Sequence, residues 1–327
     1  MIDALIEKVR QLKNPSVIGL DTAFEYLPEN MRKNANSLKG AAEAILEFNL
    51  NIIEKTYKLV PAVKVQVAYY EMYGVHGLRA FEETLRAAKA KGLVTIADVK
   101  RNDIGATAAC YSKAYLGRTL VGDREFAAFE SDFITVNGYL GGDGIKPFLE
   151  DAKKYDKGFF VLAKTSNPSS GEIQDLPIAH LSESKSDTPS LAAKVIYQKG
   201  APSLAAKVIY QAMGQLIEKW GEDNIGSFGY SRVGAVVGAT HPKEAEILRE
   251  AMPHTLFLVP GYGAQGAGSA EIKPCFDGRG LGAVVNSSRG IICAYKTDRY
   301  KGMDYASAAA AATVDMREDI VKVIDIL

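Results

Sequence analysis

The sequence predicts an α/β fold, a closed (β/α)₈ TIM barrel that forms a single domain over residues 1–327. Eight short apolar runs rich in β-branched residues recur along the chain, and helix-like segments separate most of them. The runs are nearly continuous rather than alternating, as expected for parallel strands that are buried on both faces. A doubly wound open sheet is the structural alternative that these patterns leave open.

The expected elements follow in chain order. Residues 1–16 predict an amphipathic helix, because its apolar residues recur at helical spacing on one face. That face comprises Ile2, Leu5, Ile6, Val9 and Leu12. The strands are expected at 16–21, 62–68, 93–99, 132–137, 158–164, 233–239, 255–261 and 281–288. Helices are expected between them, including 37–57, 76–92 and 241–252.

A short duplication interrupts this alternation. The decamer PSLAAKVIYQ occupies residues 189–198 and again 202–211. The copies begin 13 residues apart. Along one straight helix this offset would rotate the second copy by roughly 140° relative to the first, so the two copies could not face the same side of the helix. The second copy continues into AMGQLIEKWGEDN and is expected to belong to a core helix. We interpret the segment around 188–211 as an insertion into the domain, with the first copy on the surface and without a chemical role.

Composition excludes several classes of function. Lys+Arg and Asp+Glu number 39 each, which argues against a broad nucleic-acid or membrane-surface role. The three cysteines, Cys110, Cys275 and Cys293, are too few and scattered for a disulfide framework, and we expect reduced thiols. The N-terminus does not resemble a signal peptide, and no apolar run approaches the ~18 residues of a membrane span. We expect a soluble, cytoplasmic protein.

The strand at 93–99 ends in an unusual group of charges. Asp98, Lys100 and Asp103 lie within LVTIADVKRNDIGAT, and alternation along a strand places the first two on one face. Active sites of such barrels lie where strands end and the following loops begin. A carboxylate, an amine and a second carboxylate in one buried pocket would hold the lysine charged and fix its position. A surface salt-bridge cluster is the alternative interpretation of this spacing.

Two further charged residues lie on predicted strands. Lys64 is flanked by valines and is costly to bury unpaired, so we expect it to pair with Asp98 or Asp103 in an alternating Lys–Asp–Lys–Asp array. Alternatively its ammonium extends outward to solvent. Asp21 ends the first strand, where it could bind a ligand hydroxyl or serve as a turn or N-cap residue.

The last two strands are followed by a predicted phosphate site. VPGYGAQGAG after the seventh strand contains Pro260, Gly263 and Gln265, and VVNSSRG after the eighth contains Asn286 and Arg289. Glycines let backbone N–H groups approach an oxyanion, and these two loops commonly bind phosphate in such barrels. Arg289 could bind a phosphate with two parallel hydrogen bonds, and Gln265 could donate beside it. The alternative is a glycine-rich surface loop.

Two other strand ends carry polar residues suited to a ligand. Asn137 ends the fourth predicted strand, and Ser166 lies in KTSNPSSGE after the fifth. Hydroxyls and amides there suit the edge of a polar heterocycle, although KTSNPSSGE also fits a plain turn. The histidines are dispersed, and no GxSxG elbow, Walker A loop or GxGxxG after the first strand is present. We therefore expect no tight zinc site.

These motifs together resemble the orotidine 5′-phosphate decarboxylase family, specifically its longer, type 2 branch. The segments that carry the resemblance are GLD, AVKVQ, ADVKRNDIGAT, KTSNP, PGYGAQG and NSSRGI, spread over essentially the whole chain. The resemblance implies a cofactor-free barrel that converts orotidine 5′-phosphate to UMP and CO₂, the last step of de novo UMP biosynthesis. It also implies a homodimer with sites at the subunit interface.

The resemblance further implies roles for single residues. Lys100 matches the proton donor to C6, Asp98 the carboxylate beside the departing CO₂, and Lys64 the lysine that completes the charge network. The residues that match those reaching into the neighbouring subunit's site are Asp103, Ile104 and Thr107. The positions that match ligands of the ribose, the pyrimidine edge and the phosphate are Asp21, Ser166, Gln265 and Arg289. We expect Asn137, Pro260, Gly263 and Asn286 to complete the substrate-binding site.

Two other functions compete with this interpretation. One is a Mg²⁺-dependent sugar-phosphate lyase or decarboxylase of the same superfamily, which shares the D-x-K-x-x-D pattern on a smaller barrel. The chain length and the KTSNP and NSSRG segments argue against it. The other is a catalytically silent barrel that binds a phosphate ligand, against which the complete set of Asp98, Lys100 and Asp103 argues.

Overall fold

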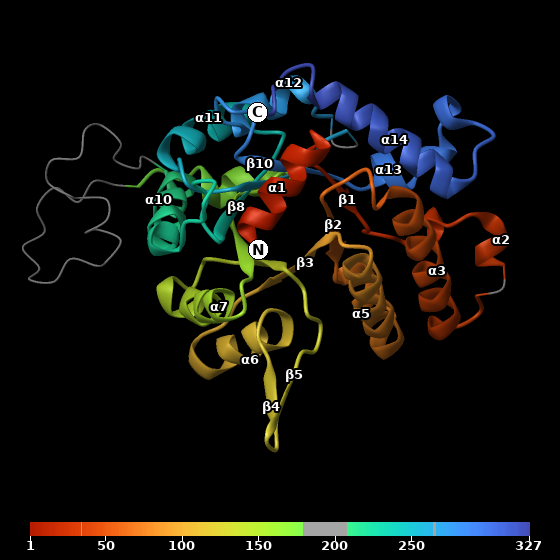
Figure 1. Cartoon of the computed structure of the whole chain (residues 1–327), viewed down its shortest axis with the longest axis horizontal. Coiled ribbons are helices and arrows are strands. Elements are labelled where there is room, and N and C mark those ends of the chain that lie inside the picture. Colours follow the sequence, from red (N-terminus) through yellow and green to blue (C-terminus); the bar gives the residue numbers. More distant parts are fainter. Residues whose placement is uncertain (34, 179–207, 264–265) are drawn as a thin grey trace, which may run out of the picture.

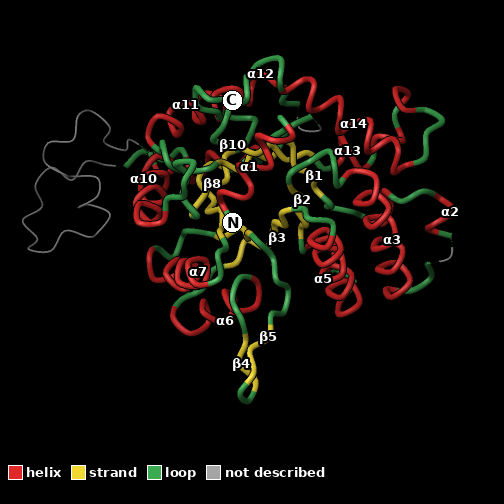
Figure 2. Tube along the Cα trace, in the orientation of Figure 1, coloured by secondary structure: helices red, strands yellow, loops and turns green. Residues whose placement is uncertain are grey.

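The computed structural model describes all residues except 34, 179–207 and 264–265. Within the described residues, eight parallel strands close into a barrel that helices surround (Figures 1 and 2). The barrel strands are β1 (Ser16–Gly19), β2 (Ala62–Gln66), β3 (Val94–Arg101), β6 (Phe133–Val136), β7 (Gly158–Lys164), β8 (Val233–Val237), β9 (Phe257–Pro260) and β10 (Ala283–Ser287). Each of the eight predicted runs supplies one of them. The prediction of a closed barrel is confirmed, and the alternative of an open, doubly wound sheet is wrong.

Strands that follow one another along the chain are neighbours in the barrel, and β10 closes it against β1. Parallel pairing requires a long return connection, which helices provide. The longer helices are α1 (Ile2–Leu12), α3 (Leu38–Thr56), α5 (Gly74–Ala90), α6 (Gly105–Tyr115), α7 (Gly142–Lys154), α10 (Ile209–Gly221), α11 (Pro242–Ala251) and α14 (Tyr305–Ile320). The shorter helices are α2 (Glu29–Arg32), α4 (Ala68–Glu71), α8 (Gly171–Gln174), α12 (Ser269–Ile272) and α13 (Arg289–Ile292). The helices predicted at 37–57, 76–92 and 241–252 correspond to α3, α5 and α11.

The N-terminal helix α1 buries the face that its sequence predicts. Ile2, Leu5, Ile6 and Val9 are buried in the main core cluster, whereas Leu12 at the end of the helix is half-buried. The helix ends at Lys13, whose left-handed backbone conformation stops the helical hydrogen bonding.

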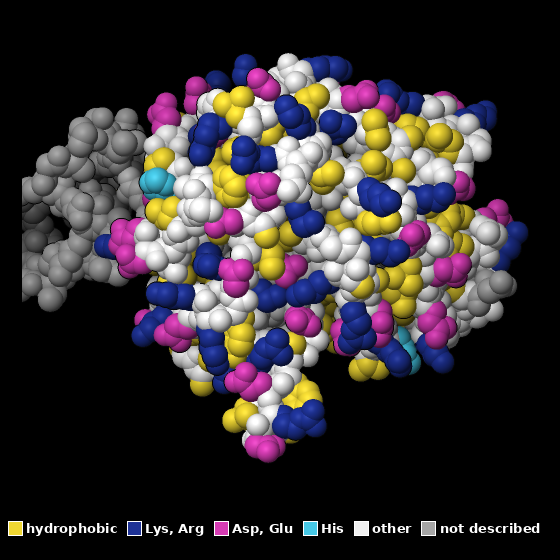
Figure 3. All heavy atoms as spheres, in the orientation of Figure 1, with side chains coloured by type: hydrophobic (Ala, Val, Ile, Leu, Met, Phe, Trp, Pro, Cys, Tyr) yellow, Lys and Arg dark blue, Asp and Glu magenta, His cyan; other side chains and the backbone are white. Residues whose placement is uncertain are grey.

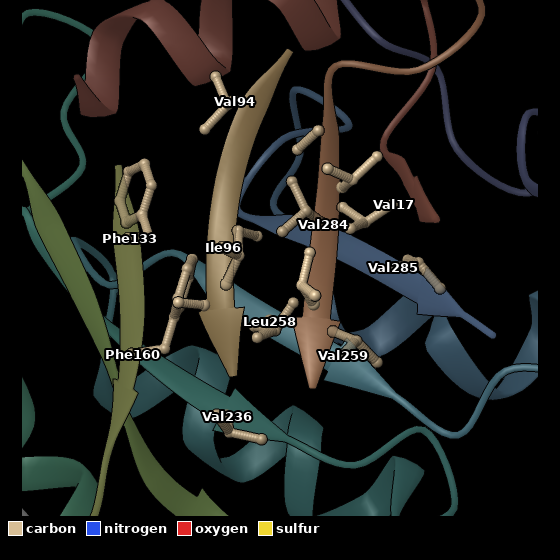
Figure 4. Packing of buried hydrophobic residues seen from close by; sticks show 14 of the residues in the cluster. Val17, Val94, Ile96, Phe133, Phe160, Val236, Leu258, Val259, Val284 and Val285 are labelled. Atoms are coloured by element: carbon tan, nitrogen blue, oxygen red, sulfur yellow. The ribbon is translucent and has the colours of Figure 1, made fainter. Parts of the chain in front are cut away.

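The barrel interior is packed with side chains from several strands (Figure 4). Phe133 on β6 and Phe160 on β7 lie with their ring centroids 5.3 Å apart. Gly234 on β8 leaves the room that these rings require, because a Cβ there would lie 2.4 Å from the Phe160 ring. The interior is therefore a packed core, which forms the closed base beneath any site at the strand ends.

A small antiparallel hairpin between α6 and β6 was not expected from the sequence. It consists of β4 (Thr119–Val121) and β5 (Arg124–Phe126), and it projects from the body of the molecule (Figure 1). All six of its strand residues are exposed. The connection from β3 to β6 therefore contains more than the single crossover helix that a simple barrel needs.

The duplicated decamer is described only in part. The last residues of the second copy begin α10, in agreement with the expected core helix. The first copy, 189–198, and residues 202–207 of the second lie outside the described residues. The proposal that this segment is an insertion into one domain therefore stays a prediction.

The surface carries charges of both signs. Lys and Arg side chains alternate with Asp and Glu over the face shown in Figure 3, in keeping with equal totals of 39. None of the helices in the described part of the chain is both long and apolar enough to cross a membrane.

Candidate active site

A cavity of about 920 Å³ lies where the barrel strands end. Its volume falls in the range typical of small-ligand sites. Its inner wall is partly apolar, with Leu162, Val236 and Leu258 contributed by β7, β8 and β9. Eight of the predicted site residues line it, namely Asp21, Lys64, Asp98, Lys100, Ser166, Pro260, Asn286 and Arg289. The strand ends therefore bring together residues that are separated by up to 268 positions in the chain (289 − 21).

Four of these residues form a chain of alternating charges, which we call the ion array: Asp21, Lys64, Asp98 and Lys100. Lys64 Nζ donates to Asp21 Oδ1 at 2.8 Å and to Asp98 Oδ2 at 3.0 Å. Lys100 Nζ donates to the other oxygen of Asp98, Oδ1, at 2.7 Å. The predicted pairing of Lys64 with Asp98 is present, and the alternative that Lys64 extends to solvent is wrong, since its side chain is 4% exposed.

Burial and the neighbouring charges shift the pKa values of Asp98 and Lys64 in opposite directions. Burial would raise the pKa of Asp98, but the ammonium groups of Lys64 and Lys100 outweigh it and hold that pKa well below its ordinary value. Burial would lower the pKa of Lys64, but the carboxylates of Asp21 and Asp98 outweigh it and raise that pKa above its ordinary value. Lys64 and Asp98 thus favour each other's ionised state at neutral pH.

Two hydroxyl groups complete the polar contacts of the array. Thr135 Oγ1 on β6 donates to Asp98 Oδ1 at 2.7 Å, and Ser288 Oγ donates to Asp21 Oδ2 at 2.7 Å. Both residues line the cavity. They lie at strand ends where the sequence predicts polar site residues, but neither was assigned a role. The position of Thr135 near the end of a predicted strand favours a role in the site. Its residue type does not distinguish this role from ordinary packing, because β-branched residues are common throughout strands.

Asp103 does not extend the array within this chain. The expected fourth member was Asp103, whereas the structure supplies Asp21. The chain leaves the barrel after β3, and Asp103 Oδ1 accepts a hydrogen bond from the backbone N–H of Ile104 at 2.8 Å. Ile104 and Thr107, at the start of α6, are exposed. These three residues therefore lie outside the cavity of their own chain.

Asn137 and Gly263 also lie outside the cavity lining. Strand β6 ends at Val136, so Asn137 is already in the following turn, where its Oδ1 accepts a hydrogen bond from Tyr139 N at 3.0 Å. Gly263 is exposed and donates its backbone N–H to Ala267 O at 2.8 Å. Local turn hydrogen bonds hold both residues, and their assignment to the substrate-binding site stays a prediction. Gln265 lies outside the described residues.

A further cationic residue, outside the ion array, lines the cavity. Arg289 begins α13 directly after β10, and its side chain is exposed. Within the described residues no carboxylate lies within salt-bridge distance of it. Pro260 at the end of β9 and the adjacent Gly261 and Tyr262 line the cavity beside it. An exposed guanidinium at the edge of a cavity is well suited to an anionic ligand group.

Ser166 is held at the cavity by close backbone packing. Its loop follows β7, and the end of β8 lies directly against it, because a Cβ on Gly238 would approach Ser166 Cα to 2.7 Å. Thr240 Oγ1 donates to the carbonyl of Ser166 at 3.3 Å. This contact fixes the backbone that presents the Ser166 hydroxyl.

The described part of the chain contains no group of three or more His, Cys, Asp and Glu side chains that could hold a metal ion.

Residues 43–300 match the model of the orotidine 5′-phosphate decarboxylase / HUMPS family. The chain belongs to this family. It is 38% identical over 323 residues to orotidine 5′-phosphate decarboxylase of Caldicellulosiruptor bescii, with 97% of each chain covered. It is 39% identical over 323 residues to the protein of the same name from Clostridium kluyveri, covering 99% of this chain and 98% of that one.

A solved structure extends the similarity to the fold. The structure of Leishmania donovani OMP decarboxylase matches with a TM-score of 0.68 at 26% identity, covering 98% of this chain and 97% of the other. The family that the motifs of the sequence indicated is thereby confirmed.

The ion array predicts a specific dependence of stability on pH. In the folded chain the pKa of Asp98 is lowered, whereas in the unfolded chain it is about 3.9. A lowered carboxyl pKa contributes stability that is present above the unfolded value and is lost as pH falls towards the folded value. The free energy of unfolding of the wild-type chain should therefore fall more steeply between pH 5 and pH 2 than that of Asp98→Asn.

Urea denaturation at several pH values measures this difference. The gap between the two proteins should shrink by up to about 1.4 kcal/mol per pH unit below the unfolded pKa. Asp123→Asn, which removes an exposed carboxylate between β4 and β5, should give a curve parallel to that of the wild type. Parallel curves for Asp98→Asn and the wild type would contradict the charged state that we assign to Asp98.

Proposed function

We propose that the chain decarboxylates orotidine 5′-phosphate to UMP and CO₂, the last step of de novo UMP biosynthesis. The observation that carries this proposal is the ion array in a partly apolar cavity, with Lys100 Nζ at 2.7 Å from Asp98 and Arg289 at the edge. Membership of the family and the names of its relatives support the same activity.

The proposed chemistry needs electrostatic stabilisation above all. When the bond between C6 of the pyrimidine and the carboxylate breaks, the electron pair remains on C6 and CO₂ leaves. The resulting carbanion has little resonance stabilisation, so a preorganised cation in a water-poor site must favour it. We assign this role to Lys100, which then transfers a proton from Nζ to C6 and is reprotonated from solvent. The scheme has no step that requires a metal or a cofactor.

The other members of the array hold this lysine in place. Asp98 contacts both Lys64 and Lys100, and we place it beside the carboxylate that departs. Two negative charges brought together there would destabilise the bound substrate relative to the transition state. Lys64 balances the charge of Asp98 from the side opposite Lys100.

The rest of the substrate is assigned to the remaining cavity residues. Asp21, which already accepts hydrogen bonds from Lys64 and Ser288, would bind the ribose hydroxyls. Ser166 would contact the pyrimidine edge, and Arg289 would bind the phosphate, with Gln265 beside it. Pro260 and Asn286 line the cavity between these groups. Binding energy at the phosphate can then lower the barrier at C6.

We also propose a cytoplasmic homodimer with sites at the subunit interface. Asp103, Ile104 and Thr107 lie outside the cavity of their own chain, and Ile104 is 59% exposed although it is apolar. An exposed apolar residue next to a carboxylate at the end of a barrel strand suits a contact with a second copy. In this arrangement Asp103 would approach Lys100 of the other subunit.

An assay with orotidine 5′-phosphate in the presence of a chelator tests the activity. We expect UMP and CO₂ to form at the same rate with EDTA as with Mg²⁺, followed by the change in absorbance of the pyrimidine. A strict Mg²⁺ requirement, or turnover of a sugar phosphate only, would favour the related lyase. Binding of UMP without any turnover would favour a silent phosphate-binding barrel.

Lys100→Ala should lower kcat by roughly 10³-fold or more, because both the cation and the proton donor are lost. UMP binding, measured by calorimetry, should change only a few-fold. Lys146→Ala on α7, which removes a lysine with a 76% exposed side chain, is the matched control and should keep the wild-type rate. Wild-type turnover by Lys100→Ala would refute the proton-donor assignment.

The same variant tests the shared site. Lys100→Ala and Asp103→Ala homodimers should each be nearly inactive, but after mixing and exchange of subunits each heterodimer has one site with both native residues. Random exchange predicts recovery of about a quarter of the wild-type activity. Absence of any recovery, despite heterodimers detected by mass spectrometry, would contradict an interface site.

Arg289→Ala should weaken binding of UMP by roughly 10- to 100-fold, as expected for a lost charge-assisted contact. Uridine, which lacks the phosphate, should bind the variant and the wild type equally. Arg299→Ala, which removes another exposed arginine, serves as the control and should leave UMP binding unchanged. An equal loss of affinity for UMP and uridine would contradict a phosphate role for Arg289.

A further inference from the structure

Thr135 contacts two members of the ion array with one hydroxyl group. Its Oγ1 donates to Asp98 Oδ1 at 2.7 Å and accepts from the backbone N–H of Lys100 at 2.9 Å. The directions follow from chemistry, because an ionised carboxylate can only accept and a hydroxyl has a single proton to donate. Thr135 itself is 1% exposed, so water does not compete freely for these bonds.

The backbone of β3 is irregular at this point. Ala97 pairs with Ile134 on β6, but the next pair is Arg101 with Val136, so β3 advances four residues while β6 advances two. Thr135 is therefore the single β6 residue opposite the segment 98–100. A bulge of this kind redirects side chains next to active sites, and it leaves backbone groups without their regular ladder partners.

Lys100 lies at the end of this bulge with a φ of 44°. A non-glycine residue rarely adopts a left-handed conformation, and surrounding contacts must hold it there. The hydroxyl of Thr135 supplies such a contact, because it accepts the Lys100 N–H at the place where the β6 backbone does not. The conformation of the Lys100 backbone in turn determines where its side chain enters the cavity.

Asp98 Oδ1 receives two donors at almost the same distance. Lys100 Nζ and Thr135 Oγ1 both lie 2.7 Å from it, whereas Lys64 donates to Oδ2. The threonine hydroxyl thus fixes the plane of the carboxylate as well as the backbone of the lysine. Both partners of the shortest ion pair in the array are tied to one side chain on the adjacent strand.

We propose that Thr135 is a positioning residue that sets the relative placement of the Lys100 ammonium and the Asp98 carboxylate for the decarboxylation. This inference rests on the proposed function, in which Lys100 protonates C6 and Asp98 faces the departing carboxylate. Thr135 acts through these two residues. Transition-state stabilisation by a fixed cation depends steeply on its placement, so loss of the hydroxyl should reduce kcat more than substrate binding.

Three substitutions test the proposal in the full-length chain. Thr135→Val keeps the β-branched shape without the hydroxyl and should lower kcat for orotidine 5′-phosphate roughly 10- to 100-fold, with KM changed less than threefold. Thr135→Ser keeps the hydroxyl and should retain kcat within about threefold of the wild type. Thr313→Val, which removes another fully buried threonine hydroxyl from α14, should leave kcat unchanged.

The pattern among these variants decides the outcome. Unchanged kcat in Thr135→Val would overturn the proposal, and so would an equal loss in Thr135→Ser. A rise in KM with unchanged kcat would also overturn it, since that result indicates a binding contact. Where Thr135→Val does not yield folded protein, Thr135→Ala provides the same comparison. Failure of the wild-type chain to decarboxylate the substrate would refute the proposed function instead.

Discussion

Two lysines and two aspartates share one set of ion pairs at the mouth of the barrel, with Lys64 and Asp98 buried at its centre, and the chemistry of the site depends on it. Moving an isolated charge out of water costs free energy. For a buried ion pair this cost is offset only when the two groups contact each other in good geometry and their remaining hydrogen-bonding positions are also filled. Lys64 meets this condition by contacting Asp21 and Asp98 together. Removing Lys64 would leave Asp21 without an ion-pair partner, and removing Asp98 would do the same to Lys100, so the two central residues hold the array together.

The barrel provides the geometry that such an array needs. Parallel strands deliver Lys64, Asp98 and Thr135 from three adjacent strands to the same end, and their backbones are fixed by ladder hydrogen bonds and by the packed interior below. Side chains on strands are held more closely than side chains on loops, which suits groups whose placement determines a rate. Phosphate recognition, by contrast, is assigned to Arg289 at the start of α13, the residue after Ser288.

A structural feature could be predicted from the sequence when it leaves a local pattern of apolar or charged residues. Burial of both faces of a parallel strand leaves a continuous apolar run, and all eight barrel strands were found from such runs. The charges at strand ends were recognised because Asp98 and Lys100 interrupt an apolar run. The hairpin formed by β4 and β5 has no buried face, so no burial pattern could reveal it. Asn137 was expected at the end of a strand, whereas β6 ends at Val136 and a local turn holds the Asn137 side chain.

The sequence alone was sufficient to predict the barrel, its family and most of the polar residues at its mouth. Buried strands and the charges that follow them can be recognised from residues that are close together in the sequence. The sequence alone was not sufficient to predict the partners within the ion array. Within the chain Lys64 pairs with Asp21 as well as Asp98, and Thr135 joins Asp98 to Lys100, through contacts across 43 and 35 positions. Such contacts depend on strand register and on the bulge in β3, which arise only when distant segments pack against each other.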